Sequence, residues 1–139
     1  MATRALNFAA FAGKLLAPLP AAEAPVLDKQ TLRDIADDMQ RDWDAGMAHV
    51  FLARAERETA WWRFQIAGGS PSTNATEYAI YCERMDALER FVARQLLIPA
   101  PRRTHLRWKR EQASAWALPD AAHAAIAADA ARIAPKQEA

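Results

Sequence analysis

Cysteine is almost absent from this chain of 139 residues, and long apolar runs and metal-binding clusters are missing. The single cysteine, Cys82, cannot form an internal disulfide, and no cysteine and histidine residues have the spacing of a structural zinc site. Packing or a partner must therefore stabilise the fold, and a reducing, cytoplasmic compartment fits best. No stretch approaches the roughly 18 consecutive apolar residues of a membrane-spanning helix, so we expect no membrane span. A degenerate export signal in the alanine-rich start of the chain is the alternative.

The residue types that favour strands are also scarce. Valine, isoleucine and threonine together supply only 15 positions, whereas alanine alone supplies 34. This composition is typical of long helices and nearly excludes a fold built on a sheet. Because alanine has a small side chain, few residues remain that can fill a core. The sequence therefore predicts a small all-α protein with a thin hydrophobic core.

Prolines divide the chain into three regions. Three prolines fall within the first 25 residues, so residues 1–26 are predicted to form a weak helix and a proline- and alanine-rich tether. Residues 27–118 should form a long antiparallel helical hairpin with a third helix packed on it. Residues 119–139 should form an alanine-rich C-terminal helix with a frayed tail.

The first long helix is expected to begin near Asp28, which can cap it. Apolar residues then recur at three- and four-residue steps from Leu32 to Trp61. Gly46 lies inside this run and costs about 1 kcal/mol relative to alanine in a helix. A continuous helix is the simplest interpretation, and a bend or break near Gly46 is the alternative.

A turn and a second helix are predicted after the first. Gly68 and Gly69 favour the end of the first helix. Asn74 and Glu77 have the spacing of a capping box that starts the next helix, which should cover residues 75–97. Large side chains recur there close to a heptad, as in a coiled coil. The two helices should be antiparallel, with the numbers of paired residues adding up to about 140.

The two arms of this hairpin have unequal lengths. In the predicted register Leu97 lies opposite Trp43, and the first helix continues for about 22 Å beyond that point. Its apolar residues Ile35 and Met39 would then have nothing opposite them. We expect a third helix, at residues 104–117, or another subunit to cover them.

The third helix carries the basic patch of the sequence. Its members are the candidate contacts for a partner or a nucleic acid: Arg102, Arg103, Arg107, Trp108, Lys109 and Arg110. Clustered cations with an aromatic side chain suit a phosphate backbone or an acidic protein surface. The first interpretation is internal, because the patch could face an acidic surface of the first helix, made of Asp34, Asp37, Asp38 and Asp42. The acidic surface of another protein is the second interpretation, and nucleic acid is the third.

Residues for catalysis, metal binding or cofactor binding are not apparent. Asp34, Asp38 and Asp42 share one helical face, but a di-iron bundle also needs Glu-x-x-His pairs, and no histidine here has a glutamate three positions before it. No glycine-framed nucleophile and no phosphate-binding glycine loop are present. We therefore predict no enzyme, no catalytic residue, no metal and no cofactor.

One segment carries a resemblance. A helix rich in tyrosine, methionine and leucine, followed by Pro99-Ala100-Pro101 and then by Leu106-Arg107-Trp108-Lys109, resembles a group of small bacterial all-helical proteins with no known activity. The resemblance spans Thr76 to Lys109. It implies an all-helical fold and a prokaryotic cytoplasm, and it carries over no site residue.

The sequence as a whole favours a small cytoplasmic protein without enzymatic activity. Its expected role is to bind another protein, or a second copy of itself, as an accessory or regulatory factor. A nucleic-acid-binding regulator that uses the basic patch is the alternative. An inhibitor protein encoded by a mobile element is a further alternative, which fits the size of the chain and its lack of catalytic residues.

Overall fold

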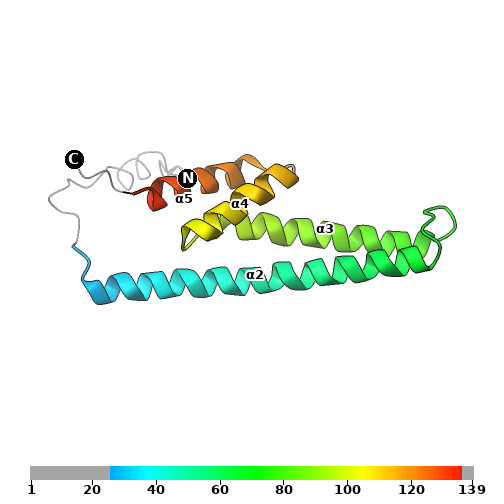
Figure 1. Cartoon of the computed structure of the whole chain (residues 1–139), viewed down its shortest axis with the longest axis horizontal. Coiled ribbons are helices and arrows are strands. Elements are labelled where there is room, and N and C mark those ends of the chain that lie inside the picture. Colours follow the sequence, from blue (N-terminus) through cyan, green and yellow to red (C-terminus); the bar gives the residue numbers. More distant parts are fainter. Residues whose placement is uncertain (1–25, 136–139) are drawn as a thin grey trace, which may run out of the picture. The chain divides into compact units, whose positions relative to one another are not determined.

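The structure, a computed structural model, describes residues 26–135, and these form helices and the turns between them without any strand. The helices are α2 (Lys29–Ile66), α3 (Ala75–Leu97), α4 (Arg103–Ala115) and α5 (Asp120–Ile133) (Figure 1). The predicted all-α fold is confirmed. The weak helix and tether expected for residues 1–26 fall, except for Val26, outside the described residues, as does the expected tail after Pro135.

The chain divides into two compact units, Met1–Leu32 and Arg33–Ala139. In the described part of the first unit, Asp28 Oδ1 accepts a hydrogen bond from the Thr31 backbone N–H at 2.7 Å. Asp28 therefore caps the start of α2 as predicted, and this backbone hydrogen bond lowers the pKa of its carboxyl group. The fold and the sites described below belong to the second unit.

Helix α3 runs antiparallel to α2 and packs along it (Figure 1). The ring centroids of Trp61 and Tyr81 are 5.1 Å apart, and those of His49 and Phe91 are 5.4 Å apart. Farther from the turn, Gln95 Nε2 donates a hydrogen bond to the Trp43 carbonyl oxygen at 3.2 Å. In each pair the two residue numbers add up to about 140. The predicted register of the hairpin is therefore confirmed.

Gly46 does not interrupt α2, which is one continuous helix from Lys29 to Ile66. A Cβ atom at Gly46 would overlap the Oε1 atom of Gln95 and would lie 2.7 Å from Ile98 Cδ1. Gln95 is buried, with 1% of its surface exposed, so its side chain has little room to move away. Glycine is therefore the residue that lets the end of α3 approach α2 this closely.

The turn between α2 and α3 contains two residues with positive φ, Gly68 at 126° and Gly69 at 65°. The capping box predicted for Asn74 is wrong, because the side chain of Asn74 makes no capping hydrogen bond to α3. Its Nδ2 atom instead donates to the Ala67 carbonyl oxygen at 2.8 Å, and its Oδ1 atom accepts from the Ser70 N–H at 3.4 Å. The side-chain amide of Asn74 thus satisfies backbone groups of the turn, and it is not available to cap the first turn of α3.

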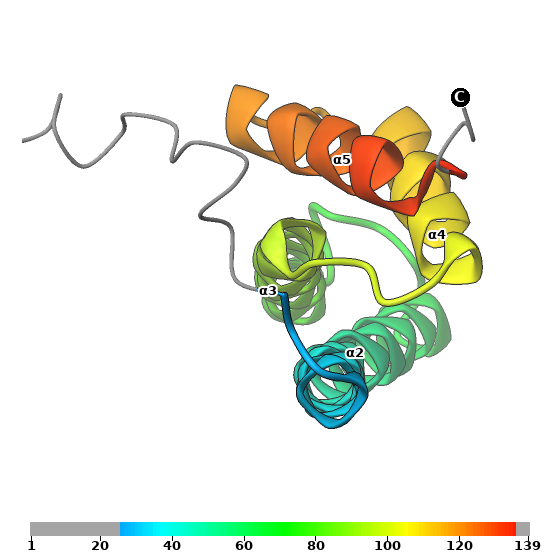
Figure 2. The same ribbon diagram turned by 90° about the vertical axis from the view of Figure 1, so that its left-hand side faces the viewer.

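Helices α4 and α5 lie on one side of the hairpin, and α5 packs against both α3 and α4 (Figure 2). All four helices or their linkers contribute to one apolar core, whose buried members are Trp43, Met47, Val50, Ala53, Leu88, Val92, Leu96, Ala100, Leu106 and Ala122. The last helix is thus part of the same compact unit as the hairpin.

The third helix packs on α2 at Trp43, where the register of the hairpin ends. The Trp43 ring meets the rings of His105 and Trp108 at centroid distances of 4.8 Å and 5.7 Å. Trp43 is consequently 3% exposed, whereas Ile35, two turns earlier, is 43% exposed. The expectation that the third helix covers the extension is therefore wrong for Ile35, which lies at the surface.

Candidate functional site

Helix α4 separates the predicted basic patch into an inner and an outer group. Lys109 is fully buried, and its ammonium group lies over the Trp43 ring at 5.8 Å from the centroid. Trp108 is half-buried with its ring edge against Trp43. The expectation that Lys109 contacts a partner is therefore wrong, and the Trp108 ring lies against the hairpin. The four arginines of the patch are exposed: Arg102, Arg103, Arg107 and Arg110.

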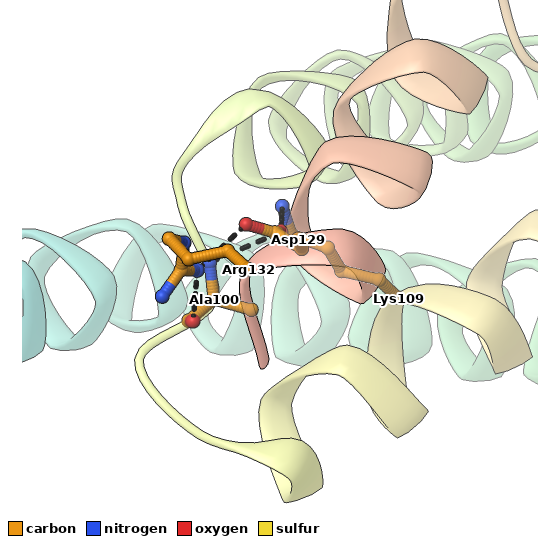
Figure 3. A network of polar contacts seen from close by, with 4 residues as sticks. All are labelled: Ala100, Lys109, Asp129 and Arg132. Carbon is orange, nitrogen blue, oxygen red and sulfur yellow. Dashed lines mark hydrogen bonds and ion pairs between the residues drawn. The ribbon is translucent and has the colours of Figure 1, made fainter. Parts of the chain in front are cut away.

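The buried Lys109 belongs to a polar network that joins α4, α5 and the linker between α3 and α4 (Figure 3). Asp129 accepts hydrogen bonds from Lys109 Nζ at 2.5 Å, from the Ala100 N–H at 3.1 Å and from Arg132 at 2.8 Å. Arg132 also donates to the Ala100 carbonyl oxygen at 2.6 Å. We call these four residues the Asp129 network. Two hydrogen bonds thus fix the linker residue Ala100, which lies outside every helix, to α5, and Asp129 joins α5 to α4 through Lys109.

Asp129 carries a negative charge inside this network. Burial of the carboxylate acts to raise the pKa of Asp129, but the hydrogen bonds from Lys109, Arg132 and Ala100 outweigh it and hold this pKa below its usual value. The carboxylate and the Lys109 ammonium group neutralise each other in the core. The network therefore has a structural role in positioning α4.

The sequence contains signals for the Asp129 network that composition and charge clustering do not reveal. Asp129 is the one charged residue in a run of alanine and isoleucine, and Arg132 follows it three positions later on the same helical face. Lys109 is the one lysine in a patch that otherwise contains arginine. A lysine carries a compact point charge on a flexible stem, which suits contact with a single carboxylate oxygen.

The predicted acidic surface on α2 does not neutralise the arginines. All four of its aspartates, Asp34, Asp37, Asp38 and Asp42, are exposed. Asp38 forms an ion pair with Arg41 of the same helix. Within residues 26–135, no ion pair involves any of the exposed arginines of α4. The interpretation that the α2 aspartates neutralise the patch is therefore wrong, and Lys109 is the one member of the patch with an internal counter-ion among the described residues.

The physical reason is the rotation of α4 about its axis. His105, Trp108 and Lys109 lie on one side of the helix and meet Trp43 of α2. Residues at 103, 107 and 110 follow steps of four and three, so they lie on the opposite side. The aromatic contacts thus turn the arginines away from α2.

Three of these arginines line a groove between α4 and α5, which we call the arginine groove. It has a volume of about 320 Å³. Its lining residues are Arg103, Leu106, Arg107, Arg110, Ala130, Ile133, Ala134 and Pro135. One wall therefore carries three cations, and the remainder is apolar. Because guanidinium groups stay charged at any physiological pH, the cations repel one another until an anion binds between them.

His105 lies beside this patch, on the inner side of α4. Burial lowers the pKa of His105, the nearby Arg102 lowers it further, and Asp44 opposes both effects. Its Nδ1 atom is buried and neither accepts nor donates a hydrogen bond within residues 26–135. The neutral imidazole that this environment favours packs on Trp43.

Other kinds of site are not evident in the part of the chain that the structure describes. No three histidine, cysteine, aspartate or glutamate side chains of residues 26–135 lie close enough together to bind a metal ion. Among the same residues, no helix combines the length and the apolar character needed to cross a membrane.

The fold and the site define an all-α protein with a long helical hairpin and two shorter helices packed on it. No model of a known protein family matches the chain, and neither a curated protein nor a solved structure matches it. Function is therefore inferred from the surface of this molecule alone.

Proposed function

We propose that this protein is a non-enzymatic interaction module that binds an acidic, amphipathic helix of a partner protein in the arginine groove. The observation that carries the proposal is the exposure of Arg103, Arg107 and Arg110 along an apolar surface, with no counter-ion within the described residues. Such a surface is complementary to a ligand that offers carboxylates and apolar side chains together.

The spacing of the arginines supports a helical ligand. Residues 103 and 110 are seven positions apart, so their Cα atoms are separated by about 10 Å along α4. Carboxylates that recur every three or four residues on a ligand helix have the same spacing. Each guanidinium group can bind a carboxylate through two parallel hydrogen bonds. Leu106 and Ile133 would meet the apolar residues of the ligand.

Nucleic acid is the second candidate, and the exposed arginines favour it as well. A phosphate backbone would find up to four cations on this surface, including Arg102. Two observations weigh against it. Trp108 packs on Trp43 and is not presented for base stacking, and the chain has a formal net charge of only +1. The inhibitor role has no structural feature of its own to support it.

Fluorescence anisotropy with two probes tests the proposal. The first probe is a helical peptide with glutamate at positions i, i+4 and i+7 beside leucines, and the second is a DNA duplex. We expect the peptide to bind the wild-type protein and the Arg103→Glu, Arg107→Glu double variant to weaken binding at least about 100-fold, since each charge reversal removes one ion pair and adds a repulsion. The charge-matched control is Arg33→Glu, Arg90→Glu, which alters exposed arginines on α2 and α3 and should bind like wild type.

The outcomes separate the candidates. Peptide binding that is equal in both double variants would contradict the proposal. Binding of the DNA duplex but not of the peptide, with an affinity that falls steeply as salt rises, would establish the nucleic-acid alternative in its place.

A further inference from the structure

One side of α2 faces away from the other helices (Figure 2). Large apolar side chains are exposed on that side. The exposed fraction of its large residues is 58% for Phe51, 60% for Leu52, 58% for Trp62 and 85% for Ile66. Ala48, Ala55 and Thr59 are exposed too and fill the positions between them. We call these seven residues the outer stripe. They recur at three- and four-residue steps, so they form one continuous face without a charged residue.

The outer stripe lies opposite the face of α2 that forms the core. The buried residues Val50, Ala53 and Phe64 contribute to the hairpin interior. Phe51 directly follows the buried Val50, and Trp62 lies two positions before the buried Phe64. Since successive residues on a helix are about 100° apart, both side chains point away from the buried face. A single helix with two apolar faces leaves one face uncovered in the isolated chain. Contiguous exposed apolar surfaces of this kind mark interaction sites.

The size of the outer stripe is sufficient for a modest dimer interface. From Ala48 to Ile66 the stripe is about 27 Å long. Its four large side chains expose on the order of 500 Å² of apolar surface, given roughly 150–250 Å² for a whole aromatic residue. Two copies with their flanking residues would bury about 1,200 Å², where specific interfaces begin.

The charges along one edge of the stripe are complementary to a second copy. Glu56 and Arg63 are both exposed and lie on the same edge, next to Ala55 and Trp62. In an antiparallel pair of helices related by a two-fold axis, each edge faces the same edge of the other copy. A two-fold axis beside Thr59 therefore places Glu56 of each copy opposite Arg63 of the other copy, which gives two equivalent ion pairs.

The same axis pairs the apolar residues by size. It brings Trp62 over Ala55 of the second copy and Leu52 over Ile66, while the two Thr59 residues meet at the centre. A large ring above a small side chain is the arrangement that allows two helices to pack closely. A shallow groove of about 300 Å³ follows this edge and is lined by Ala55, Glu56, Thr59, Ala60, Arg63, Ile80 and Arg84. One register thus satisfies the charges of this edge and the shapes together.

Glu56 also lies 3.4 Å from Arg84 of α3 within its own chain. Both side chains of that pair are more than 40% exposed, so the contact contributes little to stability. The Glu56 carboxylate lies at the edge of the stripe. A carboxylate can accept hydrogen bonds from two guanidinium groups at the same time. Arg63 forms no ion pair within the described residues.

We propose that the outer stripe packs against the outer stripe of a second copy of this chain, antiparallel, around a two-fold axis at Thr59. The proposal does not depend on the proposed function, because the outer stripe and the arginine groove share no residue. Each dimer would present two arginine grooves.

Sedimentation velocity over a range of protein concentrations tests the dimer. We expect the wild-type protein to be dimeric in the micromolar range and Trp62→Glu to be monomeric with unchanged helical content, because residue 62 is exposed in the monomer. The matched control is Leu97→Glu, which changes an apolar residue of α3 that is 52% exposed and lies outside the stripe. This control should remain dimeric.

Charge exchange tests the orientation. Glu56→Arg alone and Arg63→Glu alone should each weaken dimerisation by about tenfold or more, and the double variant should restore it, because the exchange recreates both pairs. In a Cys82→Ala background, Thr59→Cys should cross-link two copies with a short bis-maleimide, whereas Ala48→Cys should not.

Three results would overturn the proposal. One is a wild-type protein that is monomeric at hundreds of micromolar. Another is a dimer that Trp62→Glu leaves intact. The third is a monomer that co-sediments with vesicles of phosphatidylcholine and phosphatidylglycerol and loses this binding in Trp62→Glu. That result would assign the stripe to a lipid surface instead.

Discussion

Lys109 Nζ lies 2.5 Å from Asp129 Oδ2, and both side chains are buried. The two residues belong to α4 and α5, and the same carboxylate also accepts a hydrogen bond from the Ala100 N–H. A buried pair of this kind stabilises the fold little in comparison with apolar residues of similar volume, but it cannot tolerate the loss of one partner. The position of α4, and with it the arginine groove, therefore depends on both charges.

Asp129→Asn should lower the free energy of unfolding by about 3–5 kcal/mol, because it leaves the Lys109 charge buried without a counter-ion. The double variant Lys109→Met, Asp129→Leu should recover most of this loss. Urea denaturation followed by circular dichroism measures both effects. If Asp129→Asn unfolds the protein altogether, the double variant still tests the idea. A double variant as unstable as the single one would show that the pair is not the cause.

Acidification should destabilise the protein through His105. Its pKa is lowered in the folded state from the ordinary value of 6.5, so below that value the unfolded chain binds a proton that the folded chain resists. The stabilisation is complete above pH 6.5 and is lost as pH falls through the lowered pKa. The urea midpoint of wild type should therefore fall between pH 7.5 and pH 5.5 by more than that of His105→Gln. His123→Gln, an exposed control on α5, should keep the wild-type pH dependence.

Gly46→Ala should destabilise the protein although alanine is the better helix former. Alanine gains about 1 kcal/mol from helix propensity. Its Cβ atom, however, would overlap Gln95 and crowd Ile98, and overpacking of a core costs about 1–3 kcal/mol. We expect a net loss of up to about 2 kcal/mol in urea denaturation. Combining the change with Gln95→Ala should cost less than the sum of the two single changes, and strict additivity would argue against the overlap.

Peptide binding in the arginine groove should depend on salt to a degree set by the number of arginines engaged. Arg107→Ala, in the middle of the row, should weaken binding of the acidic peptide by about 1–2 kcal/mol at low ionic strength and by less at 1 M salt, where charges are screened within about 3 Å. Arg90→Ala on α3 is the control. Titration by anisotropy at both salt concentrations gives the comparison. An effect of Arg107→Ala that is the same at both concentrations would mean that the side chain contributes packing instead of charge.

Local signals in the sequence were sufficient for the helices and the register of the hairpin. The ends of α3 at Ala75 and Leu97 agree with the prediction, because glycines before it and prolines after it leave few alternatives. The length of the turn then sets the register of the two arms. The continuity of α2 at Gly46 was the simplest interpretation of the sequence and is confirmed. The reason for a glycine at this position could not be derived from local signals, since it depends on how closely α3 approaches.

The candidate site was predicted less well. The arginines were identified from their charge, but which of them face outward depends on the rotation of α4, which Trp43, His105 and Trp108 decide through their packing. The burial of Lys109 depends on Asp129, twenty positions later in the chain. The alanine-rich sequence of α5 has little periodicity, so its inward face could not be recognised from sequence alone.

The hydrogen bond from Ala100 to Asp129 gives the molecule a natural reporter of local opening. Ala100 lies in a linker, so no helical carbonyl protects its amide from exchange with solvent deuterium, and that protection comes from a side chain on α5. If α5 lifts away while α2 and α3 remain paired, this single amide exchanges and its neighbours in the hairpin do not. The exchange rate of the Ala100 amide therefore measures how often α5 detaches from the hairpin, separately from global unfolding.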